Sequence, residues 1–154
     1  MVLSALKPTP LVRRFASKIA ATAGAPILDV ACGSGRNAIV LAELGCTVIC
    51  LDKDLSPIKV QQAELSHTHL KQASQRLNLQ RLDFDRDPWP FATSSVGGII
   101  NVHFFLPALL PFFEKSLIPG RYLLLETVPG CGGNYLQLPK AGEVKIALES
   151  AYDL

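Results

Sequence analysis

The chain has 154 residues, of which 49% are hydrophobic and 18% are charged, and its formal net charge is +2. This length favours one domain with a substantial core, and this composition excludes a disordered chain. The net charge is too small to predict attraction to nucleic acid or to a membrane surface. We therefore expect a single domain over residues 1–154, with an N-terminal helical segment at 1–25 and an α/β core at 26–154.

Cysteine usage favours a reducing, cytoplasmic compartment, because no C-x-x-C pair and no signal-peptide pattern is present. We expect buried structural roles for Cys46 and Cys50 and no bound metal. The uncharged stretch between Pro88 and Glu114 is interrupted by glycines, prolines and polar residues. It therefore lacks the ~20 consecutive apolar residues of a membrane span.

The first predicted element is a helix that begins at Pro10, because Thr9 is a suitable N-cap and proline is favoured at the first helical position. Apolar residues recur at helical spacing as far as Gly24, which predicts one buried face. A short apolar strand over 26–31 follows, and then a helix over 35–44.

That strand and that helix are joined by the sequence Asp29-Val30-Ala31-Cys32-Gly33-Ser34-Gly35. Glycines allow positive φ and let a ligand approach the main chain. The start of the helix directs free N–H groups and a partial positive charge into the same space. A carboxylate at Asp29 would repel a pyrophosphate but attract an ammonium or a sulfonium. The turn therefore predicts a site for a positively charged, nucleotide-type ligand.

The next strand covers 47–51, an uninterrupted apolar run that is typical of a parallel strand buried on both faces. It ends at Asp52, and an acid about twenty residues after a glycine turn can accept ribose hydroxyls. We expect a helix over 57–70, whose histidines His67 and His69 are solvated. Further strands are expected at 77–82, 96–102 and 121–127, and helices at 108–115 and 139–151. This alternation predicts a doubly wound, mostly parallel α/β sheet.

These motifs resemble those of the class I S-adenosylmethionine (SAM)-dependent methyltransferases, over about residues 27–148. Ala31 stands where the family has its first glycine, and Arg121 replaces the second glycine of the Pro119-Gly120 element. The resemblance implies that an acid and an apolar residue after the third strand recognise adenine. These are Asp83 and Phe84, with Asp85 or Asp87 as the acid if the register slips.

The same resemblance implies the cofactor, S-adenosyl-L-methionine, and a set of residues that contact it. The implied contacts are Asp29, Ala31, Cys32, Gly33, Gly35, Asn37, Asp52, Lys53, Asp83, Phe84 and Asn101.

The implied reaction is transfer of the methyl group of SAM to a small-molecule acceptor by in-line displacement. Holding the reactants at attack distance can supply ~7–11 kcal/mol of the barrier. The finer resemblance is to the branch that includes tellurite and thiopurine methyltransferases. Aromatic and apolar segments predicted around the acceptor suit a small, moderately hydrophobic molecule: the N-terminal helix, the Trp89 loop, 103–107 and 130–135.

His103 is the candidate general base, because histidine titrates near neutral pH and this one ends the fourth strand. A wall of the acceptor pocket and a purely structural role are the alternatives for it.

The family normally adds a sixth and a seventh strand, so this chain looks C-terminally short. An uncovered fifth strand favours pairing with another chain, and we expect a homodimer or a partner at that edge. The alternative function is a catalytically weak or inactive methyltransferase-like module that acts as a cofactor-binding or partner subunit.

Two other classes fit the sequence less well. A nicotinamide-dependent oxidoreductase explains the glycine turn and Asp52 but not Asp29, and no Tyr-x-x-x-Lys pair is present. A nucleic-acid substrate is disfavoured, because the sequence has neither a basic track nor the Asn/Asp-Pro-Pro-Tyr motif of amino-methylating relatives.

Overall fold

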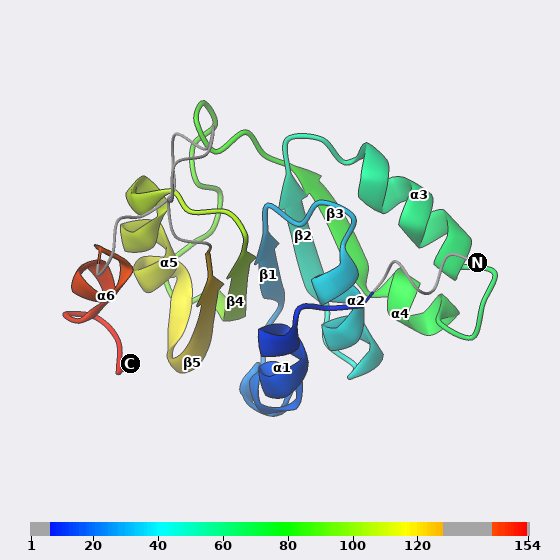
Figure 1. The fold of residues 1–154 in the computed structure, drawn as a ribbon, viewed down its shortest axis with the longest axis horizontal. Coiled ribbons are helices and arrows are strands. Elements are labelled where there is room, and N and C mark those ends of the chain that lie inside the picture. Colours follow the sequence, from blue (N-terminus) through cyan, green and yellow to red (C-terminus); the bar gives the residue numbers. More distant parts are fainter. Residues whose placement is uncertain (1–6, 128–142, 154) are drawn as a thin grey trace.

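A computed structural model describes residues 7–127 and 143–153. Its sheet has five strands in the order β3-β2-β1-β4-β5, and every pair is parallel (Figure 1). The strands are β1 (Ile27–Val30), β2 (Val48–Asp52), β3 (Leu77–Arg81), β4 (Val96–Val102) and β5 (Leu117–Glu126). The predicted doubly wound α/β fold is confirmed. The predicted acceptor segment 130–135, Cys131 and the start of the last predicted helix lie outside the described residues.

Helices cover both faces of the sheet. One apolar layer contains α1 (Pro10–Thr22), α2 (Arg36–Glu43), α3 (Ser56–Leu65) and α4 (Lys71–Gln75), and the other contains α5 (Leu110–Ser116) and α6 (Glu143–Leu148). A short 3-10 helix, η2 (Pro107–Leu109), precedes α5. Because side chains alternate along a strand, successive residues of β1 and β4 enter opposite layers. No helix of the described ranges is long and apolar enough to cross a membrane.

Two predicted boundaries differ from the structure by four residues or more. The helix expected over 57–70 ends at Leu65, because the hydroxyl of Thr68 bonds the backbone of Leu65 (2.8 Å) and of Leu70 (3.0 Å), which favours a turn over a continued helix. The short helix α4 follows that turn, and His67 and His69 are exposed. The fifth strand begins at Leu117 rather than at 121, since the Pro119-Gly120 turn is absorbed as an irregularity in its pairing with β4.

Helix α1 is fixed at both of its ends. A Cβ atom at Gly97 of β4 would lie 2.2 Å from the carbonyl oxygen of Ala23, so only glycine allows this close approach. Arg121 Nε donates to the same carbonyl at 3.3 Å, where a helix C-terminus favours positive charge. At the other end, the N–H of Thr9 donates to Asn37 Oδ1 at 3.0 Å. Helix α1 is thereby held beside the start of α2.

Candidate functional site

The turn between β1 and α2 lies at the carboxyl end of the sheet, where ligands bind in open α/β folds. The N–H of Cys32 donates to the carbonyl of Leu51 at 3.0 Å, which ties the turn to β2. Gly33 and Gly35 have φ of 55° and 79°, in the left-handed region. A Cβ atom at Gly35 would lie 2.6 Å from Ile58 Cδ1, whereas one at Gly33 would meet no atom within 4 Å. Packing therefore requires Gly35, and Gly33 leaves the main chain open to a ligand.

Ala31 also has a left-handed backbone, with φ of 56°. This conformation costs an L-residue other than glycine roughly 1–2 kcal/mol. The position at which the sequence departs from the family's first glycine is therefore one where the backbone favours glycine.

Asp52 holds the turn from the end of β2. Its Oδ2 accepts the N–H of Gly33 at 3.0 Å, and its Oδ1 accepts the N–H of Asp54 at 3.1 Å. Each carboxylate oxygen keeps a further lone pair, so both can accept a second hydrogen bond. Lys53, the next residue, is exposed.

Asp29 is buried under the same turn, with 2% of its surface exposed. The pKa of Asp29 is raised to about 7, chiefly by burial and also by the nearby Asp52 carboxylate, although a backbone hydrogen bond at Ala38 and the charge of Arg36 oppose the rise. Its Oδ2 is buried and has no hydrogen-bond partner among the described residues. Since a buried charge needs a partner, this carboxyl fits a ligand that brings a positive group.

A pair of thiols lies beside Asp29. A hydrogen bond with the thiol of Cys32 raises the pKa of Cys50, and burial and the Asp29 carboxylate add to the effect. Cys50 is therefore a protonated, buried thiol, as expected for a structural role.

Asp83 and Phe84 follow β3. The N–H of Asp83 donates to Asp87 Oδ2 at 2.8 Å, and Asp83 Oδ1 accepts the N–H of Asp85 at 3.1 Å. Asp83 is half-buried while Asp85 and Asp87 are exposed, so the register favours Asp83 as the inward acid. The ring of Phe84 lies 5.4 Å from that of Phe104, measured between centroids.

Two other predicted cofactor contacts, Asn101 and Asn37, are not free side chains beside Asp29. Asn101 pairs with Val30 in the β1–β4 register, whereas Asp29 pairs with Ile100, so the side chains of Asn101 and Asp29 enter opposite faces of the sheet. Asn101 Oδ1 is buried without a partner among the described residues. Asn37 Oδ1 already accepts the backbone N–H of Thr9.

His103 follows β4 and has a partner that the sequence reasoning missed. His103 Nε2 lies 3.1 Å from Oε1 of Glu126, the last residue of β5. The side chains of His103 and Glu126 are 47% and 26% exposed. The sequence shows that each residue stands at the end of an apolar strand, but the pairing of β4 with β5 that brings them together is seen only in the structure.

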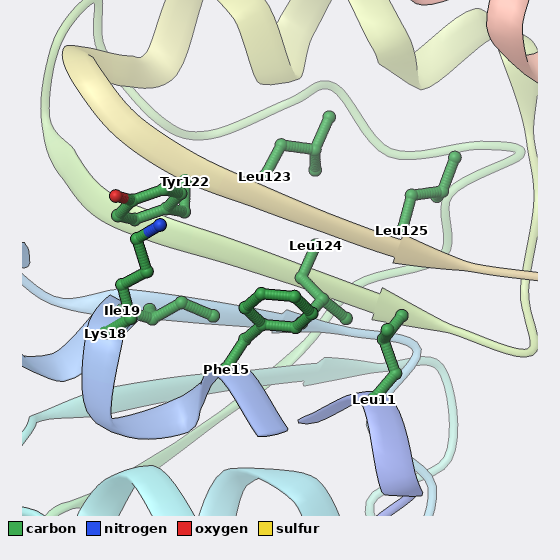
Figure 2. Close-up of a pocket in the computed structure, with 8 residues that line it drawn as sticks. All are labelled: Leu11, Phe15, Lys18, Ile19, Tyr122, Leu123, Leu124 and Leu125. Carbon is green, nitrogen blue, oxygen red and sulfur yellow. The ribbon is translucent and has the colours of Figure 1, made fainter. Parts of the chain in front are cut away.

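A cavity of about 250 Å³ lies between α1 and β5, away from the glycine turn (Figure 2). Lys18 Nζ lies 5.2 Å from the ring centroid of Tyr122 at one end, and Leu11 and Leu125 lie at the other (Figure 2). The Trp89 loop does not line this cavity, because Trp89 Nε1 donates to Ser116 Oγ at 2.7 Å and its ring packs against aromatic side chains of α5.

Residues 27–115 match a family described as "Methyltransferase domain". The chain belongs to this methyltransferase family. Among curated proteins, no sequence matches the chain significantly.

Solved methyltransferase structures share the fold. The crystal structure of TehB from Haemophilus influenzae matches with a TM-score of 0.70 and 16% identity, over 90% of this chain and 49% of TehB. Coclaurine N-methyltransferase matches with a TM-score of 0.66 and 14% identity, over 93% of this chain and 47% of that one. The glycopeptide N-methyltransferase MtfA, bound to sinefungin, matches with a TM-score of 0.60 and 20% identity, over 77% and 53%. The chain thus spans about half the length of these three proteins.

Proposed function

We propose that this chain binds SAM at the turn between β1 and α2 and serves methyl transfer to a small-molecule acceptor. The observation that carries the proposal is Asp29, a buried carboxyl with a free oxygen beside a turn whose main chain is open at Gly33. SAM is a nucleoside with an ammonium and a sulfonium, and its sulfonium supplies an electrophilic methyl group when bound. Family membership supports the proposal, and so does a structure of the related-fold protein MtfA in complex with SAM.

The remaining residues take roles that follow from their positions. Asp52 accepts the ribose hydroxyls with the lone pairs that Gly33 and Asp54 leave free. Asp83 and Phe84 border the adenine at the end of β3. The turn residues Ala31, Cys32 and Gly35, together with Asn37, Lys53 and Asn101, complete the proposed surroundings of the cofactor.

We propose a small, moderately hydrophobic acceptor and, separately, a relationship to the small-substrate branch that includes tellurite and thiopurine methyltransferases. Half-buried apolar side chains along α1 and β5 support this acceptor class. The neighbours named above are described as acting on acceptors as different as a glycopeptide and coclaurine, so fold similarity leaves the choice to experiment.

We assign His103 the role of general base for acceptors that begin protonated. A His103→Gln protein with unchanged turnover between about pH 6 and 8 would refute that role.

Calorimetry with SAM and its demethylated product tests cofactor binding. We expect both to bind, and we expect Asp29→Asn to weaken SAM binding at least about 10-fold, because a charged hydrogen bond contributes roughly 1.5–3 kcal/mol. Asp153→Asn is the matched control, since Asp153 is exposed and has no proposed role in cofactor binding. Equal losses in the two variants, or no binding to the unchanged protein, would contradict the proposal. A screen of small thiols, chalcogen oxyanions and phenols with labelled methyl donor then identifies the acceptor.

A second candidate function is a partner subunit, and one observation favours it. Within the described residues β5 pairs only with β4, and an apolar cavity lies between β5 and α1. Such an edge can accept another strand. Light scattering after gel filtration tests this candidate: a dimer together with absent SAM binding supports it, and a monomer that binds SAM contradicts it.

A further inference from the structure

The end of β4 and the end of β5 are joined by two hydrogen bonds between the same two residues. The backbone N–H of His103 donates to the carbonyl of Glu126 at 2.7 Å, and their side chains meet at 3.1 Å. His103 has a left-handed backbone with φ of 59°, a conformation that non-glycine residues rarely adopt outside strained or functional positions. Both the backbone and the ring of His103 are therefore fixed by Glu126.

The side-chain contact determines which ring nitrogen carries the hydrogen. An ionised carboxylate only accepts hydrogen bonds, so Nε2 of His103 must be the donor. In a neutral imidazole the other nitrogen, Nδ1, then keeps its lone pair. The second oxygen of Glu126, Oε2, is buried and has no partner among the described residues, so the carboxylate has no competing side-chain donor there.

We propose that Glu126 is a positioning residue that holds neutral His103 as its Nε2–H tautomer, so that Nδ1 is the atom that takes the acceptor's proton. This inference rests on the proposed function. The proton moves from the acceptor atom to Nδ1, and the electron pair of the broken bond stays on the acceptor atom as its nucleophilic pair. The carboxylate of Glu126 then compensates the charge of the protonated ring.

The place of the pair suits this role. Both residues stand at the carboxyl ends of neighbouring parallel strands, where open α/β sheets bind their ligands. Leu125, which precedes Glu126, lines the cavity between α1 and β5 (Figure 2). The ring is half-exposed and therefore open to a substrate, unlike Asn101 two residues earlier, which is 1% exposed.

Nitrogen-15 NMR of the histidine rings tests the assignment without an acceptor. The sequence has three histidines, and a His103→Gln sample identifies the signals of His103 by their absence. At about pH 8.5 we expect an observable Nε2–H proton and an unprotonated Nδ1 for His103, and rapidly exchanging, averaged rings for the exposed His67 and His69. A hydrogen on Nδ1 of His103 would overturn the proposal.

Two variants separate positioning from general stability. In Glu126→Ala we expect the Nε2–H signal to be lost to exchange and the ring nitrogens to move to the values of His67 and His69. In Glu126→Gln the amide oxygen can still accept from Nε2, so the signal should persist. An unchanged His103 spectrum in Glu126→Ala refutes the proposal.

Calorimetry on the same samples distinguishes failure of the Glu126 assignment from failure of the proposed function. We expect SAM affinity to change less than about 2-fold in Glu126→Ala. A fixed tautomer without SAM binding supports the assignment of Glu126 and refutes the proposed function. SAM binding with a freely exchanging ring refutes the assignment of Glu126 alone.

Discussion

The N–H of Gly33 donates to Oδ2 of Asp52 at 3.0 Å, so the end of the second strand holds the turn that follows the first. Asp52 thus has a structural role in the turn besides its proposed contact with ribose. A variant at this position changes the turn even when no ligand is present, and its effects on stability and on binding must be measured separately.

We expect Asp52→Ala to lower the free energy of unfolding by about 1–3 kcal/mol, because it leaves the N–H groups of Gly33 and Asp54 without their acceptor. Asp52→Asn should cost less, since its amide oxygen can still accept one of these bonds. Urea unfolding monitored by circular dichroism measures both. Equal stability of Asp52→Ala and the unchanged protein would show that the two bonds contribute nothing.

The two glycines of the turn should respond differently to alanine. Gly35→Ala combines left-handed strain with a contact of 2.6 Å to Ile58 and should destabilise the fold by about 2–4 kcal/mol. Gly33→Ala adds a methyl group in open space, so it should cost only about 1–2 kcal/mol of strain. SAM affinity should nevertheless fall at least about 10-fold in Gly33→Ala, by blocking main-chain approach. Thermal unfolding and calorimetry on both variants check this, and a fully functional Gly33→Ala protein would count against the turn as the cofactor site.

Ala31→Gly should raise the free energy of unfolding by about 0.5–1 kcal/mol. The substitution removes left-handed strain of roughly 1–2 kcal/mol and adds an entropic cost of about 0.5–1 kcal/mol in the unfolded chain. Denaturant midpoints with an unchanged slope measure the gain. Ala38→Gly, in the buried helix α2, is the matched control and should lose stability.

The unliganded protein should lose stability as pH rises from about 4 to about 7. Folding raises the pKa of Asp29 from 3.8 to about 7, so in this range the folded state holds a proton that the unfolded state has released. At 1.36 kcal/mol per pH unit the full effect is about 4 kcal/mol. Asp29→Asn should flatten this part of the pH profile of unfolding. An unchanged slope in Asp29→Asn would assign the pH dependence to other groups.

Ligand binding should show the opposite trend with pH. A positively charged ligand pairs with the ionised carboxylate of Asp29, so SAM affinity should rise as pH increases through about 7 and then level off. Below about pH 7, SAM binding should therefore release the proton of Asp29. Calorimetry in buffers of different ionisation enthalpy detects this release. A pH-independent affinity in the unchanged protein would argue that Asp29 does not meet the cation.

The sequence by itself determined the strands, the glycine turn and the position of the acids along the chain. Buried parallel strands appear as apolar runs, and the left-handed conformation that the turn requires at Gly33 and Gly35 is a local property of glycine. Both features depend on neighbours in the chain, so periodicity and residue type were sufficient for them.

Only the tertiary structure decided which side chains meet. The contact between His103 and Glu126, the hold of Asp52 on Gly33, and the placement of Asn101 on the face opposite Asp29 all depend on the register of strands that are distant in sequence. A shift of one residue in that register would exchange the two faces of a strand, and no local pattern fixes it. Register is set by the packing of the whole sheet between its two helical layers, which is why the fold could be predicted and the partners of its functional residues could not.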